Sequence, residues 1–427
     1  MEVILKLIGL AVLLASLPSF ALNLGTIETK SYPEIDIRDI HNKDVKREKK
    51  GEAPRFAVER YTQVSPFMDQ NFTKENGNLV WRYRVVATNA VSLNFAFTKF
   101  KMSESSELNI YATDFSERIR SFTSKDNNEA GELWTPVIYS DDVIIELVMN
   151  ESDFGNVELE LTQVNQGYRT FAETTEKSGS CNVDVVCTEG DNWRDEINAV
   201  GVISTGGSTF CTGFMVNNTS NDKTPYFMTA NHCRIGARNS ASLVVYWNYQ
   251  ASSCGGRRNG KKDEFSTGSK FLASSAKSDF ALVKLNQVPD AKWGVTYAGF
   301  DATGVDASQA VAIHHPSTDE KAISFEYDPT TVTGYLSEDV PGAGTHIRVE
   351  DWDVGTTEPG SSGSPLFNQD HRVIGQLHGG YASCSSQTSD WYGRIHVSWE
   401  GEGTAATRLK DHLDPNNTGA LVTDTLK

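Results

Sequence analysis

The sequence predicts an all-β protein made of two β-rich parts, with a helix near the C-terminal end. Short apolar segments, several of them alternating with a period of two, recur through most of the chain and are separated by polar turns. Few stretches show the spacing of an amphipathic helix. At 427 residues the chain is also too long for one ordinary domain. We therefore expect two or three structural units.

The first 21 residues have the pattern of a secretory signal peptide. Lys6 gives a weak basic flank, LIGLAVLLASL is a short apolar run, and SFA at 19–21 provides small side chains for cleavage. A membrane anchor is the alternative, but the run is shorter than the roughly 20 residues that span a bilayer. We expect a secreted, extracellular protein that is periplasmic in transit.

Two polar segments divide the rest of the chain. Residues 22–54 include the charged cluster KDVKREKKGE and predict a solvated linker. A second polar linker covers 169–177. Between them, residues 55–168 carry alternating apolar runs, which predict a small antiparallel β domain, with a sandwich as one arrangement. It contains the segments VWRYRVVA, VSLNFAFTKF, LNIYA, LWTPVIY, VIIELVM and VELELTQV.

Residues 178–427 form the C-terminal part. Many short strands, frequent turn signals and few helices predict a β sandwich or a pair of Greek-key barrels. A closing helix is expected at TAATRLKDHL, because Leu409 and Leu413 stand four apart and Pro415 prevents continuation. The expected strands are FCTGFMVNN, YFMTA, SLVVYWNYQ, DFALVKL, AVAIHH, AISFEY, HIRVEDW, PLFN, RVIGQLHGG and RIHVSW.

The cysteines and the net charge exclude several classes of function. All six cysteines lie between 181 and 384, which predicts three disulfides in an exported domain. No pair has the close CxxC spacing of zinc ligands. The net charge of −17 gives no basic surplus for a phosphate backbone, so nucleic acid is not an expected partner. No phosphate-binding loop or metal-ligand cluster stands out, so we expect neither cofactor nor metal.

Three short segments together carry the chemistry of a serine nucleophile. His232 ends the apolar strand YFMTANHC, and Asp279 opens the apolar strand SDFALVKL, where it is placed to orient the second ring nitrogen of a histidine. Ser362 lies in GSSGSP, where small residues leave the amides of Gly360 and Ser362 able to face a developing oxyanion. Each segment alone also fits a core residue, a cap or a turn. The combination in one exported all-β domain predicts catalysis.

From SGSCNVDVVC at 178 to the end, the chain resembles the bacterial lysyl endopeptidases, a family of chymotrypsin-fold serine proteases. The matching segments include VVYWNYQ, AIHHP, TEPGSSGSP, GQLHGG, SDWYGR and AATRL. SLNFAFTKF and LWTPV upstream are similar, more weakly, to the propeptides of that family. The resemblance implies a double Greek-key β-barrel preceded by a propeptide.

The resemblance also assigns roles to the residues. It makes Ser362 the nucleophile, His232 the general base and later acid, and Asp279 the residue that orients the imidazole. It also implies the disulfides Cys181–Cys384, Cys187–Cys254 and Cys211–Cys233, one pairing among the fifteen that six cysteines permit.

Specificity for lysine depends on a buried acid. The position six residues before the nucleophile, which carries the acid in trypsin-like enzymes, is Thr356 here. By the resemblance, Asp390 in SDWYG takes that role, and without the resemblance it would be an ordinary surface turn. His378 matches a residue beside the pocket, and Gly379 and Gly380 would let a substrate strand pair there.

One departure from the family concerns the pocket wall. The family has a tryptophan a few residues before GAGTH to stack on the histidine, whereas this chain reads YLSEDVPGAGTH. We expect a looser wall and a less strict choice of lysine over arginine. His314 and His315 are adjacent in a strand, so we expect them to face opposite sides, one solvent and one core.

The precursor is expected to cleave itself between Lys177 and Ser178. Lys177 is the only lysine from 126 to 222, and it lies in a polar segment able to enter an active site. The released propeptide would act as an intramolecular chaperone or inhibitor, and the mature enzyme would be a monomer acting on proteins or peptides. The alternatives are a broader Lys/Arg protease and an inactive, peptide-binding relative.

Overall fold

The structure is a computed structural model that describes residues 23–427 except 49, 51, 170–178, 257–258 and 340–343. The expected signal peptide at 1–21 and the expected processing bond between Lys177 and Ser178 therefore lie outside the described residues. Within the described part, no helix has both the length and the apolar character needed to cross a membrane.

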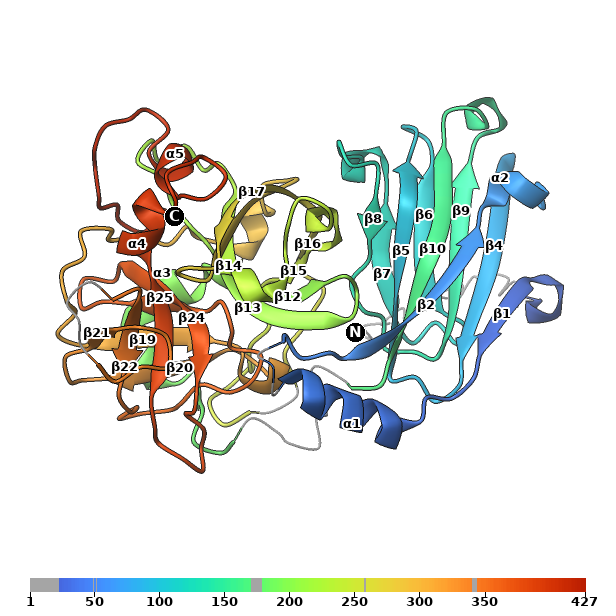
Figure 1. Cartoon of the computed structure of the whole chain (residues 1–427). Helices are drawn as coiled ribbons and strands as arrows, with labels where there is room; N and C mark the ends of the chain where they lie inside the picture. Colours follow the sequence, from blue (N-terminus) through green and yellow to red (C-terminus); the bar gives the residue numbers. More distant parts are fainter. Residues whose placement is uncertain (1–22, 49, 51, 170–178, 257–258, 340–343) are drawn as a thin grey trace, which may run out of the picture.

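Residues 28–167 form two packed sheets, called here the upstream sandwich (Figure 1). One sheet has the order β1-β4-β9-β6-β7, with β3 beside β4, and the other has the order β2-β10-β5-β8. The strands are β1 (Glu28–Tyr32), β2 (Ala57–Val64), β3 (Thr73–Glu75), β4 (Asn78–Ala87), β5 (Ser92–Lys101), β6 (Glu107–Ala112), β7 (Arg118–Phe122), β8 (Leu133–Trp134), β9 (Asp142–Met149) and β10 (Glu158–Gly167).

Strand β4 shows why the period of two predicts this sheet. Tyr83 and Val85 are buried in the sandwich core, whereas Arg82 and Arg84 face outward and donate to carboxylates on the neighbouring strand β9. Arg82 lies directly opposite Glu146, and opposite charges in such a cross-strand pair stabilise the two strands. The alternation in the sequence therefore predicts both the strand and which of its two faces is buried.

The expectation of a solvated linker at 22–54 is wrong for the described residues. Strand β1 pairs with β4, in parallel, and the helix α1 (Ile37–Glu48) follows it. Asp44 in this helix is 2% exposed and accepts hydrogen bonds from Arg55 and the hydroxyl of Tyr168. A polar segment can be ordered in this way because its buried carboxylate is fully paired.

The downstream part consists of two curled sheets, which confirms the predicted pair of β-barrels (Figure 1). The first has the order β16-β15-β12-β13-β14-β18-β17 and the second β11-β20-β19-β23-β24-β25-β22-β21. The first contains β12 (Val200–Thr205), β13 (Thr209–Met215), β14 (Tyr226–Ala230), β15 (Val244–Tyr246), β16 (Phe265–Thr267), β17 (Ser269–Ser275) and β18 (Phe280–Leu285). The second contains β11 (Val183–Asp184), β19 (Ala310–His314), β20 (Ala322–Glu326), β21 (Thr331–Thr333), β22 (His346–Val349), β23 (Pro365–Phe367), β24 (Val373–Gly380) and β25 (Asp390–Arg394).

The end of the C-terminal part departs from the expected strand and helix. RIHVSW is not a strand, because β25 ends at Arg394 and the helix α4 (Ile395–Glu400) begins there. The expected helix at 404–413 is reduced to α5 (Lys410–Leu413). Thr404 and Thr407 exchange hydrogen bonds with each other's backbone and side chains, which competes with helix formation. The other short α-helices of the described residues are α2 (Pro66–Asp69), in the upstream part, and α3 (Arg194–Ile197), before β12.

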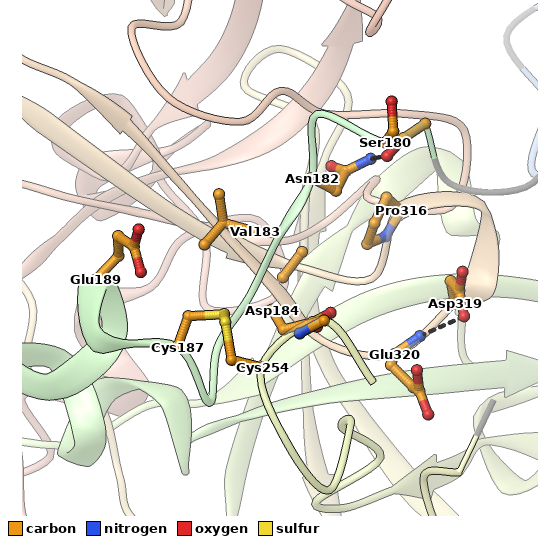
Figure 2. A pocket seen from close by; sticks show the side chains of 13 residues that line it. Ser180, Asn182, Val183, Asp184, Cys187, Glu189, Cys254, Pro316, Asp319 and Glu320 are labelled. Carbon is orange, nitrogen blue, oxygen red and sulfur yellow. Dashed lines mark hydrogen bonds between the residues drawn. A yellow bond between two sulfur atoms is a disulfide. The ribbon is translucent and has the colours of Figure 1, made fainter. Parts of the chain in front are cut away.

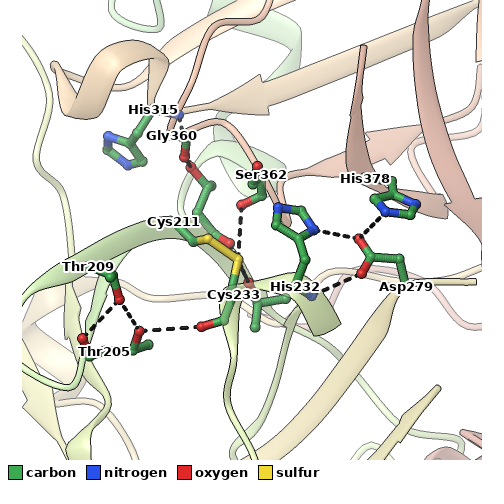
Figure 3. The surroundings of a disulfide bond; sticks show 12 residues. Thr205, Thr209, Cys211, His232, Cys233, Asp279, His315, Gly360, Ser362 and His378 are labelled. Atoms are coloured by element: carbon green, nitrogen blue, oxygen red, sulfur yellow. Dashed lines mark hydrogen bonds and ion pairs between the residues drawn. A yellow bond between two sulfur atoms is a disulfide. The ribbon is translucent and has the colours of Figure 1, made fainter. Parts of the chain in front are cut away.

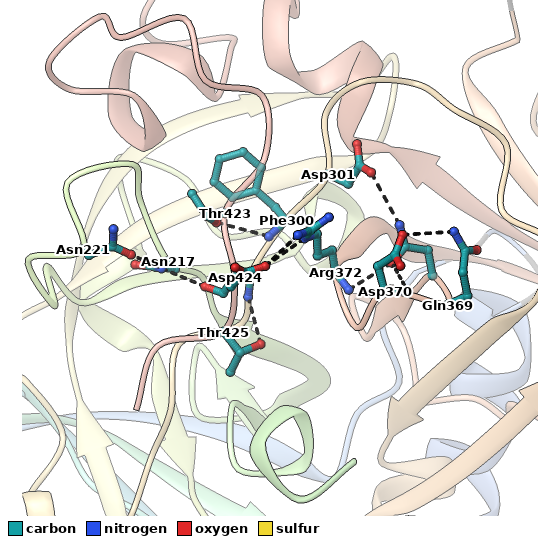
Figure 4. A network of polar contacts seen from close by, with 12 residues as sticks. Asn217, Asn221, Phe300, Asp301, Gln369, Asp370, Arg372, Thr423, Asp424 and Thr425 are labelled. Carbon is teal, nitrogen blue, oxygen red and sulfur yellow. Dashed lines mark hydrogen bonds and ion pairs between the residues drawn. The ribbon is translucent and has the colours of Figure 1, made fainter. Parts of the chain in front are cut away.

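The C-terminal segment is tied to the body of the protein by polar contacts (Figure 4). Arg372 donates through Nε and a terminal nitrogen to Oδ1 of Asp424, and Asn217 donates to the backbone oxygen of the same residue. Tyr297 and Leu426 pair through both backbone groups. The end of the chain is thereby fixed against segments that are remote in the sequence.

The upstream sandwich and the first barrel share one hydrophobic cluster. Phe122 of the sandwich lies 6.3 Å from Phe265 of the barrel between ring centroids, and Arg120 lies over the same Phe265 ring. The buried amide of Val137 donates to the hydroxyl of Tyr246 at 3.0 Å. The two parts are therefore packed as one interior in the full chain.

Candidate active site

His232 and Asp279 are brought together by two adjacent antiparallel strands. β14 ends just before His232, and β18 begins just after Asp279. Asp279 Oδ2 lies 2.7 Å from His232 Nδ1, and Oδ1 accepts the backbone amide of His232 at 2.9 Å. Asp279 is 2% exposed and has a left-handed backbone with φ of 55°. The carboxylate therefore fixes both the ring and the backbone of the histidine.

The loop that carries Ser362 requires glycine at two positions. Gly360 and Gly363 have φ of 102° and 84°, and a Cβ on Gly363 would lie 2.3 Å from Thr229 Oγ1. Thr212 holds the loop, because its amide donates to the oxygen of Ser362 and its hydroxyl to the oxygen of Gly360. Among the described residues, neither the Gly360 nor the Ser362 amide has an acceptor. Both amides remain available to bind an oxyanion.

A buried histidine supports this loop, and the sequence reasoning missed it. His314 Nδ1 lies 2.8 Å from the hydroxyl of Ser361, and its Nε2 lies 3.1 Å from Ser324 Oγ. Burial lowers the pKa of His314 to about 3, so the ring is neutral. His315 is also buried, contrary to the expectation that one of the two faces solvent. His314 thus positions the neighbour of Ser362.

A cavity of about 760 Å³ contains His232, Ser362, His378 and Asp390. Asp390 is 1% exposed, and its Oδ2 accepts hydrogen bonds from Trp352 Nε1 at 2.8 Å and Thr357 Oγ1 at 2.7 Å. Burial raises the pKa of this carboxyl, and the two hydrogen bonds act in the opposite direction. None of the described residues forms an ion pair with it. A cation that entered the cavity would supply the missing charge.

Gly379 and Gly380 lie at the end of β24, beside this carboxylate. A Cβ on Gly380 would lie 2.2 Å from Asp390 Oδ1. Any residue other than glycine would therefore displace the carboxylate. The register between β24 and β25 shifts between Leu377 and Gly379. Such a bulge changes the direction of a side chain, here that of His378, which lies beside Asp279.

His378 is held in a row of rings, which corrects the expectation of a looser wall. The ring of Tyr335 is stacked on His378, so tyrosine supplies the aromatic face for which the family uses tryptophan. His346 Nε2 lies 2.9 Å from His378 Nδ1, and Thr345 Oγ1 lies 2.8 Å from the other nitrogen of His346. Burial lowers the pKa of both His346 and His378 to about 4. Sequence reasoning missed Tyr335 and His346, although an aromatic residue near the expected tryptophan was a visible signal.

The six cysteines form the three disulfides that the resemblance implies. They are Cys181–Cys384, Cys187–Cys254 and Cys211–Cys233. Figure 3 shows Cys211–Cys233 on one side of His232 and His378 on the other. The Cys211–Cys233 bond therefore joins strand β13 to the residue that follows the histidine.

Two groups of donor side chains in the described part of the chain lie close enough together to be compared with a metal site. His232, Asp279 and His378 have ligand atoms within 4.8 Å of one another, but the facing atoms of the first two already share a hydrogen bond. Cys211 and Cys233 are disulfide-bonded. A second hollow of about 300 Å³ beside Cys187–Cys254 is lined by Asp184, Glu189, Asp319 and Glu320 (Figure 2), and it contains none of the catalytic candidates.

Comparison with known proteins decides the family. The family model for the C-terminal domain of lysyl endopeptidase matches residues 175–393, which is just over half of the chain. The chain belongs to the lysyl endopeptidase family. The lysyl endopeptidase of Pseudomonas aeruginosa is 29% identical over 342 residues, which cover 74% of this chain and 71% of that protein.

Two solved protease structures are also similar to this member of the lysyl endopeptidase family. A thermostable serine protease from an extremophilic microorganism is 14% identical. The similarity covers 47% of this chain and 92% of the chain of that protease, with a TM-score of 0.33. The protease Anisep from Arthrobacter nicotinovorans is 16% identical, covers 46% and 90%, and also has a TM-score of 0.33. The family assignment rests on the sequence match. The chain is a serine endopeptidase, and its substrates are proteins or peptides.

Proposed function

We propose that this endopeptidase cleaves peptide bonds on the C-terminal side of lysine. The observation that carries the proposal is the buried Asp390 carboxylate in the cavity that also contains Ser362 and His232. In this proposal, the lysine ammonium binds the Asp390 carboxylate while the carbonyl carbon of the same residue lies at Ser362. A buried carboxylate without a countercharge is costly, and an ammonium relieves that cost.

Ser362 acts as the nucleophile in this proposal. His232 removes the hydroxyl proton as Oγ bonds to the substrate carbonyl carbon, and Asp279 stabilises the imidazolium that forms. The amides of Gly360 and Ser362 stabilise the oxyanion. When the intermediate collapses, the C–N bond breaks and His232 gives its proton to the leaving amine. Water then cleaves the acyl enzyme by the same steps, which restores the serine.

The substrate strand is proposed to pair with the end of β24, beyond the residues that pair with β23. His378, Gly379 and Gly380 line the cavity, and the two glycines let a backbone approach closely. The stack of Tyr335 on His378 gives this wall a fixed position. A fixed wall favours the slim lysine over the broader guanidinium of arginine.

The protein is proposed to be made as a secreted precursor that cleaves itself after Lys177. Support comes from the three disulfides, which are typical of exported proteins, and from the fact that Lys50, Glu52 and Pro54 of the upstream part line the active-site cavity. The upstream sandwich covers apolar residues of the first barrel, as expected of an intramolecular chaperone and inhibitor. The mature enzyme acts as an extracellular monomer.

The test of specificity is a digest of a denatured protein mixture by the purified enzyme, with all new termini identified by mass spectrometry. Cuts after lysine are expected, lost in Ser362→Ala and strongly reduced in Asp390→Asn. Asp411→Asn, a change in a carboxylate that pairs with Arg408 at the surface, is the matched control and keeps full activity. Equal cutting after arginine, or an unchanged pattern in Asp390→Asn, would contradict the proposal.

Self-processing has a separate test. The Ser362→Ala precursor is produced in a protease-deficient host, and its N-terminus is determined by mass spectrometry. The proposal predicts that the bond after Lys177 stays intact and that a small amount of active enzyme cuts it. Cutting of the inactive precursor on its own would show that self-processing is not required.

A further inference from the structure

The segment 52–56 of the upstream part lies on the protease as an added strand. The amide of Phe210 donates to the oxygen of Pro54 at 3.1 Å, and the amide of Phe56 donates to the oxygen of Ser208 at 2.8 Å. Arg55 is the antiparallel partner of Thr209 in this short ladder. Extended peptides bind exposed sheet edges in this way.

This edge lies on the leaving-group side of the active site. The lysine-binding candidate Asp390 and the glycines at the end of β24 lie on the side of His378, whereas Phe210 adjoins the Cys211–Cys233 disulfide on the other side of His232 (Figure 3). A substrate whose lysine occupies the cavity must continue past Ser362 toward Phe210. Residues that follow the cleaved bond therefore fall where this segment lies.

The segment also runs in the direction of a substrate. Glu52 and Pro54 line the cavity with Ser362, and farther along the chain Phe56 packs against Phe210, with ring centroids 6.3 Å apart. The chain thus leaves the nucleophile and follows the edge outward. The side chains of the segment 52–56 therefore indicate which substrate side chains this part of the cleft can accept after the cleaved bond.

Glu52 has a cationic partner that belongs to the protease. Its Oε2 lies 3.2 Å from a terminal nitrogen of Arg234, two residues after His232, and 2.9 Å from Arg47 of the upstream part. When the upstream part departs, Arg47 departs with it and Arg234 stays. Among the described residues, Glu52 is the one carboxylate within ion-pair distance of Arg234. Mature enzyme therefore presents a positive charge beside the cleft, with its side chain 59% exposed already in the precursor.

We propose that Arg234 makes the leaving-group side of the cleft selective for substrates with an acidic side chain among the first residues after the cleaved bond. The inference rests on the proposed function, because it takes the orientation of the substrate from Asp390. An ion pair of this exposure changes a rate by about two- to fivefold. The preference should weaken as salt is added, since ions screen exposed charges.

The test uses active enzyme obtained by producing and processing the full chain. Matched peptides contain one lysine followed by three residues, with glutamate or glutamine placed in turn at each of the three positions, and kcat/KM is measured for each. Wild-type enzyme is expected to prefer glutamate about two- to fivefold at one position. In Arg234→Gln the preference disappears while the glutamine peptide is cut at the wild-type rate. Arg408→Gln, a remote arginine that pairs with Asp411, keeps the preference.

A second readout separates this proposal from the specificity for lysine. In the digest of denatured protein, the residues after every cut are scored whatever residue precedes the cut. Acid enrichment that Arg234→Gln removes supports the proposal even if the cuts do not follow lysine. An equal rate for glutamate and glutamine at all three positions, or a preference that persists in Arg234→Gln, overturns it.

Discussion

Tyr335 lies flat on the imidazole of His378, with ring centroids 3.6 Å apart and an interplanar angle of 5°. His378 in turn lies 3.7 Å from the carboxylate of Asp279 and is stacked near His232 at 5.5 Å. The wall of the cavity and the candidate catalytic histidine are thus parts of one row of rings. A change in the outermost ring should therefore affect catalysis, although Tyr335 is far from the nucleophile in the sequence.

Replacement of Tyr335 distinguishes the ring from the hydroxyl. Tyr335→Phe keeps the stacked ring and should retain nearly full kcat/KM on a lysine peptide. Tyr335→Ala removes a stacking interaction of about 0.5–1.5 kcal/mol, and should lower kcat/KM roughly two- to tenfold while increasing the share of cuts after arginine. Steady-state kinetics on paired lysine and arginine peptides gives both quantities. Equal values for the two variants would show that the ring does not support the wall.

Trp352 should matter for lysine binding because its indole donates to the buried Asp390. Trp352→Phe keeps most of the packing and removes one hydrogen bond to a charged group, worth about 1.5–3 kcal/mol, so kcat/KM on lysine peptides should fall roughly ten- to hundredfold. Trp391→Phe is the matched control, since that buried indole donates to the backbone oxygen of Ser337 instead. If both variants lose activity equally, the effect is one of packing.

Lys321 predicts a dependence of stability on pH. Its side chain is fully buried and donates to the oxygen of Ile197, and burial lowers its pKa to about 7. Between pH 7 and about 10 the unfolded chain binds a proton that the folded protein does not, so the free energy of unfolding should rise with pH. The upper limit of this slope is about 1.4 kcal/mol per pH unit.

Denaturant unfolding of inactive Ser362→Ala protein at pH 7, 8 and 9 measures this slope. Lys321→Met should flatten the curve relative to the unsubstituted protein. Lys284→Met, at an exposed position in β18, serves as the control and should leave the slope unchanged. Parallel curves for all three proteins would mean that Lys321 does not release its proton in this range.

Under the proposed processing after Lys177, the contact between Val137 and Tyr246 should stabilise the full chain but not the processed enzyme. Tyr246→Phe leaves the buried amide of Val137 without its acceptor, at a cost of about 1–3 kcal/mol. The melting temperature of the inactive precursor should therefore fall more than that of the processed enzyme. Equal decreases in both would place the effect within the barrel alone.

The sequence predicted strands best where alternation was clear and the partner strand was local. β4, β5, β9 and β10 each overlap most of a segment expected to be a strand, and their ends differ from the expected ones by up to three residues. β1 was missed because its five residues are mostly polar and exposed, and its pairing in parallel with β4 depends on a contact remote in the chain. Apolar periodicity carries no information about such an edge strand.

The candidate site likewise contains residues that local motifs predict and residues that depend on remote contacts. His232, Asp279 and Ser362 were predicted from short motifs, because backbone turns and a buried acid have local signatures. His314 and His346 were not, since each supports the site through a side-chain contact with a residue more than thirty positions away. No local pattern marks Trp352 as a donor to Asp390. Contacts of this kind require the fold.

The single hydrophobic interior that joins the upstream sandwich to the first barrel limits how such chains can be recombined. Phe122 and Phe265 fit against each other across the junction, so a substitution on one side changes the shape that the other must match. An upstream sandwich taken from a distant relative would bring a differently shaped surface to this barrel. The two parts are therefore expected to be inherited as a pair, and an exchange between relatives should succeed only when both faces of the junction are transferred together.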